Sequence, residues 1–195
     1  MKKILIYLVV FILSFFILIK GSTHLYQHQY HYITSILLSC SAVALLNFLT
    51  FKFLFKKVKF GFVAFITYGI LITYLIFCLY PRNDKNFKTN EIKKEYNDLN
   101  PILRLGVGTL FLIDRNSLMT DASRTKSDCI LMKINYNSDH MIHEDGYCYA
   151  IDISVRDRSE IRNWFVGLYF KIMGYYTLRH DQGFGDHYHI AIRNK

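Results

Sequence analysis

Three long apolar stretches near the N-terminus limit what this chain can fold into. They comprise residues 4–19, 33–51 and 60–80, and none of them contains a charged side chain. A helix needs roughly 20 apolar residues, each rising about 1.5 Å, to cross a hydrocarbon layer about 30 Å thick. The sequence therefore predicts a membrane module over residues 1–80, with transmembrane helices at about 4–20, 33–51 and 60–80.

The first stretch has a competing interpretation as the apolar region of a signal peptide, because it follows Lys2 and Lys3. A signal peptide ends at a cleavage site of small residues. Residues 20–23 (KGST) offer no good small-x-small pattern. We therefore expect an uncleaved transmembrane helix.

Charge is distributed unevenly along the chain. All fifteen Asp and Glu residues follow Tyr80, so residues 1–80 carry +7 and the remainder carries +2. Lysines precede the first stretch and fill the turn at 52–59, and lysine-rich loops stay in the cytoplasm. Three crossings of a cell membrane then place the C-terminal domain on the outer, periplasmic or extracellular, side. Basic residues at 82–94 oppose this orientation, but long domains translocate largely regardless of such charge.

The rest of the chain has the pattern of a linker and one soluble domain. Residues 81–98 are polar and predict a linker with a short helix at 91–98, and residues 99–195 predict the domain. Short runs rich in aromatic and β-branched residues predict strands, at 107–113, 147–153, 175–178 and 188–192.

One helix is predicted in this domain, at 158–173, because apolar residues recur there at three- and four-residue spacing and Gly174 follows. These apolar residues are Ile161, Trp164, Phe165, Leu168 and Ile172. The predicted fold class is thus three N-terminal transmembrane α-helices followed by a small α+β domain.

Four cysteines occur, and none forms a CxxC pattern. Cys40 and Cys78 lie within predicted spans, whereas Cys129 and Cys148 lie in the domain. In an exported domain the latter two could form a disulfide, and two free buried thiols are the alternative.

The strongest chemical signal is at the end of the chain, where residues 180–189 (HDQGFGDHYH) run into an apolar strand. Alternate strand residues face the same side, so His187 and His189 project together. Two imidazoles can bind one metal, or one can bind while the other contacts a reacting group. A pair of surface histidines beside a glycine turn is the alternative.

A second constellation lies upstream, where Asp152 stands in an apolar strand and needs a counter-charge or a metal. His143 precedes that strand. His143, Asp152 and His189 would supply three ligands of the types zinc accepts, with a fourth position for water. An ion pair between Asp152 and Arg156 or Arg158 is the alternative.

These residues resemble the LAS-type zinc peptidases, which include D-alanyl-D-alanine carboxypeptidases and dipeptidases, penicillin-insensitive murein endopeptidases and the Hedgehog signalling domain. In that group a His and an Asp, typically within S-x-H-x-x-G-x-A-x-D, bind zinc with the second His of a late H-x-H. Residues 186–189 (DHYH) look like the D-H-x-H of the murein endopeptidases, and residues 180–189 are similar to the H-D-x-G-x-G-x-H-x-H ending of small phage-encoded relatives. The resemblance covers residues 99–192 and implies an antiparallel sheet.

The resemblance implies one zinc ion per chain, with His143, Asp152 and His189 as its ligands. His143 and Asp152 stand nine residues apart where the pattern has seven, and residues 138–140 (SDH) offer a competing S-x-H, so His140 is the alternative first ligand. Asp186, three residues before the last ligand, would be the catalytic base. His187 would stabilise the oxyanion or share the proton transfer.

Three further residues complete the predicted site. Residues 119–125 (MTDASRT) resemble a strand ending in a substrate-binding arginine, so Arg124 would bind a substrate carboxylate. A solvated turn arginine is the alternative. His180 and Asp181 would either orient the ligands or shape the glycine turn.

The function expected from orientation and resemblance is a membrane-anchored zinc metallopeptidase that hydrolyses peptide bonds of peptidoglycan stem peptides or cross-links. Its partners would be peptidoglycan peptides and the lipid bilayer. We do not expect nucleic-acid binding, because the basic surplus flanks the predicted spans. The alternative is a catalytically inactive peptidase-like domain that binds cell-wall peptides or a protein partner.

Overall fold

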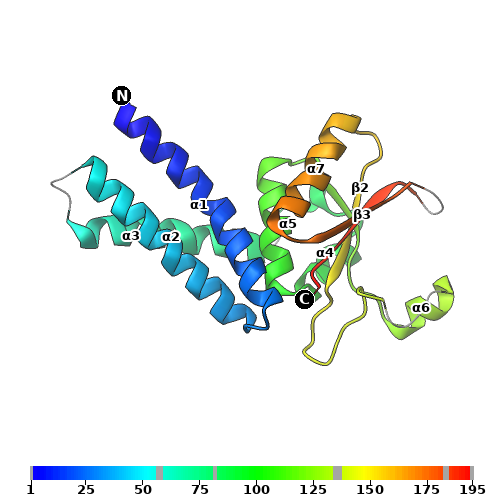
Figure 1. Ribbon diagram of the computed structural model, residues 1–195. Coiled ribbons are helices and arrows are strands. Elements are labelled where there is room, and N and C mark those ends of the chain that lie inside the picture. Colours follow the sequence, from blue (N-terminus) through cyan, green and yellow to red (C-terminus); the bar gives the residue numbers. More distant parts are fainter. Residues whose placement is uncertain (1, 56–58, 81–82, 134–137, 182–184, 194–195) are drawn as a thin grey trace. The chain divides into compact units, whose positions relative to one another are not determined.

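The computed structural model describes residues 2–55, 59–80, 83–133, 138–181 and 185–193. It comprises two compact units, Met1–Ile76 and Phe77–Lys195 (Figure 1). Lys56 and Lys57 of the predicted cytoplasmic turn, and residues 182–184 of the predicted glycine turn, lie outside the described residues.

The three predicted apolar helices are α1 (Lys2–Gln27), α2 (Tyr32–Leu54) and α3 (Phe60–Leu79), and the first unit contains all of them except the last residues of α3, from Phe77. All three are long and apolar enough to cross a membrane, which confirms the prediction of three such helices. Helix α1 continues without a break through residues 20–23. It packs against α2, where the Asn47 amide donates a hydrogen bond to Ser14 Oγ at 2.8 Å.

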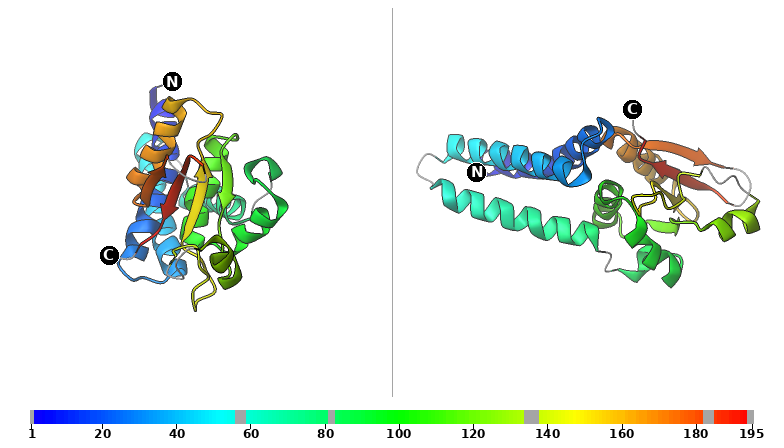
Figure 2. Two further views of the ribbon diagram at one scale, coloured as in Figure 1. Left: turned by 90° about the vertical axis from the view of Figure 1, so that its right-hand side faces the viewer. Right: turned by 90° about the horizontal axis from the view of Figure 1, so that it is seen from below.

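The second unit contains a four-stranded antiparallel sheet with the order β1-β2-β4-β3 (Figure 2). Its strands are β1 (Leu118–Asp121), β2 (Ala150–Ser154), β3 (Tyr176–His180) and β4 (His187–Ala191). In the centre of the sheet, Asp152 of β2 stands opposite His189 of β4, and His189 also stands opposite Leu178 of β3. The antiparallel sheet implied by the resemblance is therefore present.

One predicted strand is wrong, because residues 107–113 belong to helix α5 (Pro101–Ile113). The helix begins where the Asn100 side chain accepts a hydrogen bond from the Ile102 amide at 2.9 Å, and Pro101 occupies its first turn. Almost every side chain of α5 is buried, so the helix has no polar face to reveal its period. A short apolar run of this kind cannot be assigned to helix or strand by periodicity alone.

The segment expected to be a linker is folded onto α5. It forms a 3₁₀ turn (Asp84–Asn86), helix α4 (Asn90–Glu95) and a second 3₁₀ turn (Tyr96–Asp98). The Tyr96 ring is fully buried, and its hydroxyl lies 2.6 Å from the Cys78 carbonyl oxygen. Two further helices belong to this unit, α6 (Lys126–Met132) and α7 (Glu160–Met173).

Helix α7 confirms the predicted helix and covers one face of the sheet. Ser159 caps its N-terminus, and Gly174 ends it with a φ of 98°, in the left-handed region that favours glycine. At Gly167 a Cβ atom would lie 2.8 Å from the Tyr188 hydroxyl, so α7 packs directly on the Tyr188 side of β4. Because side chains alternate along a strand, His187 and His189 face the opposite side of the sheet.

Candidate metal centre

Two paired strands and one loop bring the centre together. Asp152 and His189 are direct cross-strand neighbours on the face of the sheet that α7 leaves open. His140 belongs to the loop between α6 and β2. That loop is held by backbone hydrogen bonds, from the Arg124 amide to the His140 carbonyl and from the Tyr149 amide to the Asp139 carbonyl, both at 2.9 Å.

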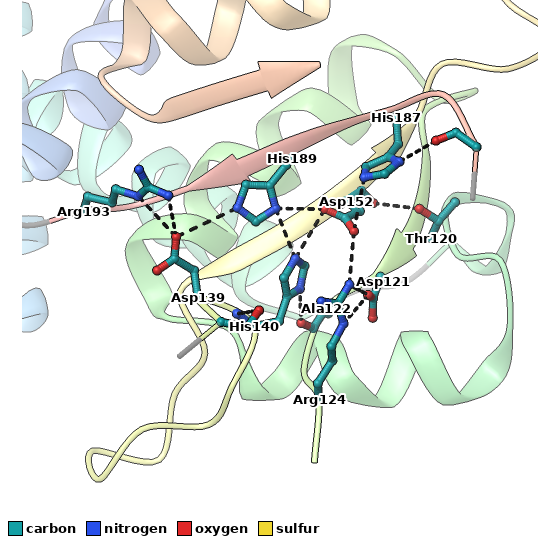
Figure 3. A network of polar contacts seen from close by, with 12 residues as sticks. Thr120, Asp121, Ala122, Arg124, Asp139, His140, Asp152, His187, His189 and Arg193 are labelled. Carbon is teal, nitrogen blue, oxygen red and sulfur yellow. Dashed lines mark hydrogen bonds and ion pairs between the residues drawn. The ribbon is translucent and has the colours of Figure 1, made fainter. Parts of the chain in front are cut away.

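The three side chains converge on one point (Figure 3). His140 Nε2 lies 3.2 Å from His189 Nδ1 and 3.3 Å from Asp152 Oδ1, and His189 Nδ1 lies 3.1 Å from the same oxygen. Ligand atoms held about 2.0–2.1 Å from a tetrahedral zinc ion stand about 3.3–3.4 Å apart. The observed triangle is close to this size, so the three residues could hold a metal ion.

The outer nitrogens of both rings lie near acceptors, within hydrogen-bond distance for His140 and beyond it for His189. His140 Nδ1 lies 2.6 Å from the Ala122 carbonyl oxygen. A carbonyl only accepts, so Nδ1 carries a proton. Nε2 faces the centre, where it donates to Asp152 when the ring is protonated and offers a lone pair to a metal when the ring is neutral. His189 Nε2 lies 3.9 Å from Asp139 Oδ2, and Arg193 binds the same oxygen at 2.9 Å. Such outer partners orient histidine ligands in metal sites.

Asp152 is the charged centre of the group and is only 6% exposed. Burial opposes its ionisation, but the contacts from His140 and His189 outweigh burial and hold the pKa of Asp152 well below its ordinary value. Its second oxygen, Oδ2, lies 3.5 Å from Arg124 Nη2 and 3.6 Å from His187 Nε2. The carboxylate is therefore ionised at neutral pH, as a metal ligand must be.

The expected first ligand, His143, is not part of this group, and His140, the alternative, takes its place. His143 is exposed, and its ring packs edge-on against Tyr149 with the centroids 4.9 Å apart. Strand β2 begins only at Ala150, and the chain before it makes a tight turn at Gly146, whose φ is 82°. This turn keeps His143 away from the sheet.

Asp186, the expected base, is engaged elsewhere. Its carboxylate binds Arg179 at 2.9 Å (Nε) and 2.6 Å (Nη2), and Arg179 also binds Glu160 at the start of α7. Arg179 stands opposite Tyr188, so this ion pair lies on the α7 side of the sheet, away from His187 and His189. The hydrogen bond from Arg179 holds the pKa of Asp186 below its ordinary value.

His187 lies beside the centre, as the strand alternation predicted. Its Nδ1 lies 2.7 Å from the Gly185 carbonyl oxygen and must donate to it, so Nε2, 3.6 Å from Asp152 Oδ2, is the nitrogen that can gain or lose a proton. The His180 ring is exposed, with its centroid 5.1 Å from that of His187. Asp181 follows β3 and is exposed.

Arg124 also borders the centre. Its guanidinium binds Asp121 at 2.7 Å through Nε and approaches Asp152, so it is held between two carboxylates rather than solvated in a turn. Of the predicted alternative partners of Asp152, Arg158 binds Asp114 and Ser117, and the guanidinium of Arg156 lies against Gly185.

The two domain cysteines, Cys129 and Cys148, are free and buried. Burial raises the pKa of the Cys148 thiol to about 12, so this thiol is inert at neutral pH. Cys129 packs against Met141, with 3.3 Å between the two sulfur atoms.

Comparison with known proteins yields no match to a family model, a curated protein or a solved structure. The chemistry of the centre is therefore inferred from its own residues.

Proposed function

We propose that this chain is a membrane-anchored zinc metallopeptidase whose metal ligands are His140, Asp152 and His189. The observation that carries the proposal is the triangle of ligand atoms with 3.1–3.3 Å sides, in which the outer nitrogen of each ring faces an acceptor. Two imidazoles and one carboxylate are a donor set that zinc accepts in catalytic sites, where a fourth position stays open.

A zinc ion held there would polarise a substrate carbonyl and lower the pKa of a bound water toward about 7. His187 is the best placed residue to move the proton. Its Nε2 faces the centre without a proton in the neutral ring, so it can accept one from the attacking water and deliver it to the leaving amine. We assign this role to His187 rather than to Asp186, because Arg179 holds the Asp186 carboxylate on the other side of the sheet.

Arg124 would bind a carboxylate of the substrate. Its guanidinium lies beside Asp152 and is bound to Asp121, and a planar guanidinium can bind a second carboxylate in bidentate fashion. A free C-terminal carboxylate is a group that peptidoglycan stem peptides present.

The substrate class follows from the predicted orientation of the membrane module. If the domain lies outside the membrane, the peptides most abundant beside it are the stem peptides and cross-links of peptidoglycan. The resemblance to peptidases of that substrate supports the same class.

A second candidate function is binding of cell-wall peptides without hydrolysis. Two observations favour it. Asp186, the base implied by the resemblance, is bound to Arg179, and His140 and Asp152 are twelve residues apart where the pattern has seven. A domain of this kind could bind a metal and peptides without hydrolysing them.

The test compares His140→Ala with His143→Ala in the full chain, purified in detergent. Zinc content is measured by mass spectrometry of the metal, and hydrolysis is measured on defined stem-peptide and cross-linked fragments. We expect about one zinc ion per chain and hydrolysis in the parent and in His143→Ala, and loss of both in His140→Ala.

The two histidines are three residues apart in the same loop, so His143→Ala is a matched control for the substitution itself. Loss of zinc in His143→Ala but not in His140→Ala would overturn the ligand assignment. Stoichiometric zinc with binding but no hydrolysis of any fragment would favour the binding domain.

A further inference from the structure

Helix α7 has two apolar faces, and only one of them packs against the domain. The face that covers the sheet and α5 is buried and contains Asn163, Val166, Gly167, Phe170 and Met173. The opposite face is exposed: Ile161 is 70% exposed, Trp164 57%, Phe165 58% and Ile172 54%. At about 100° per residue these two sets lie on opposite sides of the helix.

The exposed face is continuous. Leu168 fills the interval between Phe165 and Ile172, so the stripe extends over residues 161–172, about 17 Å of helix. Charged side chains flank it at Arg162 and Lys171. A helix with two apolar faces is normally covered on both of them, by protein or by lipid.

This helix lies close to the end of the third candidate span. Helix α5 runs antiparallel beside α7: the Tyr169 hydroxyl donates to the Gly106 carbonyl at 2.8 Å, and Arg162 binds Asp114 at 2.7 Å (Figure 1). The last residues of α3, from Phe77, belong to the same compact unit as α5 and α7.

Helix α5 also contacts that end of α3. A Cβ atom on Gly108 would lie 2.6 Å from Cys78 Cα, and Arg104 Nη1 donates to the Leu79 carbonyl at 3.3 Å. Helix α7 is therefore separated by one helix from the point where a membrane span ends.

We propose that the exposed face of α7, defined by Ile161, Trp164, Phe165, Leu168 and Ile172, lies in the headgroup layer of the bilayer that the chain itself crosses. An apolar stripe with aromatic residues, flanked by Arg and Lys, is the composition of helices that lie in the membrane interface. Because a transmembrane span would end at the interface, the adjacent end of α3 places that interface close to α7, and no partner protein is needed to cover the exposed face.

This arrangement determines which way the candidate metal centre faces. Helix α7 covers the Tyr188 side of the sheet, whereas Asp152, His187 and His189 lie on the other side. With α7 on the bilayer, one helix and one sheet separate the centre from lipid. The centre then opens toward the aqueous side and takes its substrate from there. The proposal for α7 rests on the helix alone and does not depend on the metal.

Trp164 is the only tryptophan in the chain, so its fluorescence reports on this face alone. The full chain is reconstituted in phosphatidylcholine vesicles with and without lipids brominated near the headgroup end of their acyl chains. We expect emission at short wavelength, loss of emission with the brominated lipids and little quenching by iodide.

Two variants calibrate the measurement. Trp164→Phe with Phe65→Trp places the probe on an exposed position of α3, where brominated lipid should quench it. Trp164→Phe with His143→Trp places the probe on an exposed position of the loop before β2, where iodide alone should quench it.

Quenching of Trp164 by iodide and not by brominated lipid would overturn the proposal, because the face would then be in water. Quenching by neither would also overturn it and would identify protein as the cover, either residues 1–76 or a second copy of the chain. These results leave the zinc measurement on His140→Ala unaffected.

Discussion

Side chains outside the triangle of candidate ligand atoms surround the ring of His189. Asp139 is the clearest of these, because its Oδ2 atom faces His189 Nε2 while Arg193 holds the same oxygen. Arg193 is itself fixed, with its guanidinium carbon 3.7 Å above the centroid of the Tyr176 ring. This chain of contacts keeps the Asp139 carboxylate beside the ring of His189.

We predict that Asp139→Asn weakens zinc binding by about 10- to 100-fold, the usual effect of removing an outer carboxylate partner of a histidine ligand. The affinity is measured by competition with a chromophoric chelator. Asp157→Asn is the control, because Asp157 is exposed and lies in a turn with a φ of 56° that asparagine tolerates. Equal affinities of the parent and Asp139→Asn would contradict the orienting role.

The assignment of proton transfer to His187 makes a prediction of its own. His187→Gln should lower kcat by about 10²- to 10⁴-fold while the chain retains its zinc, since general acid–base catalysis typically contributes that much. Asp186→Asn should lower kcat far less and should instead lower the stability, because it breaks the ion pair with Arg179. Zinc content and steady-state kinetics are measured on both proteins. If Asp186→Asn lowered kcat more than His187→Gln does, Asp186 rather than His187 would be the catalytic base.

At the scale of helices and strands, the elements predicted most accurately from the sequence are those that a single local rule determines. Length and hydropathy alone predict α1, α2 and α3, and Gly174 marks the end of α7 because a glycine cap is a local feature. Helix α5 was mispredicted because it is buried on nearly all sides. The exposed stripe of α7 revealed the period of the helix, yet the face that packs on the sheet is the other one.

The candidate site likewise has features that local rules predict and one feature that they do not. Strand alternation predicted that His187 and His189 share a face, and the apolar surroundings of Asp152 predicted that it needs a partner. The choice between His140 and His143 depends on the path of the loop before β2. That path is set by a turn at Gly146 and by contacts with residues 98 and 192, which are distant in sequence. A rule based on the spacing of residues in the sequence cannot predict that path.

Helix α5 also yields a prediction about packing. In Gly108→Ala the new Cβ would lie 2.6 Å from Cys78 Cα and 3.0 Å from the Cys78 carbonyl oxygen, and backbone atoms cannot rotate away as a side chain can. We expect a destabilisation of about 1–3 kcal/mol, as for other overpacked contacts. Thermal unfolding of the full chain in detergent measures it. Gly69→Ala is the control, because no atom lies within 4 Å of a Cβ at that position. Equal unfolding midpoints would mean that α5 does not pack against the end of α3.

At the scale of the whole chain, the proposed substrate depends on which side of the membrane the second unit occupies. If all three candidate spans cross, the residues before α1 and those after α3 lie on opposite sides, and the lysines before α1 and between α2 and α3 favour a cytoplasmic N-terminus. Alkaline phosphatase, which is active only outside the cytoplasm, fused after Lys195 in a bacterial host should therefore be active. A fluorescent protein that matures only in the cytoplasm, fused at the same position, should show no fluorescence.

The opposite pair of results would exclude peptidoglycan as the substrate but would not affect the assignment of the metal ligands. A domain on the cytoplasmic side would need a peptide substrate from that compartment, so this one measurement decides which peptides are assayed.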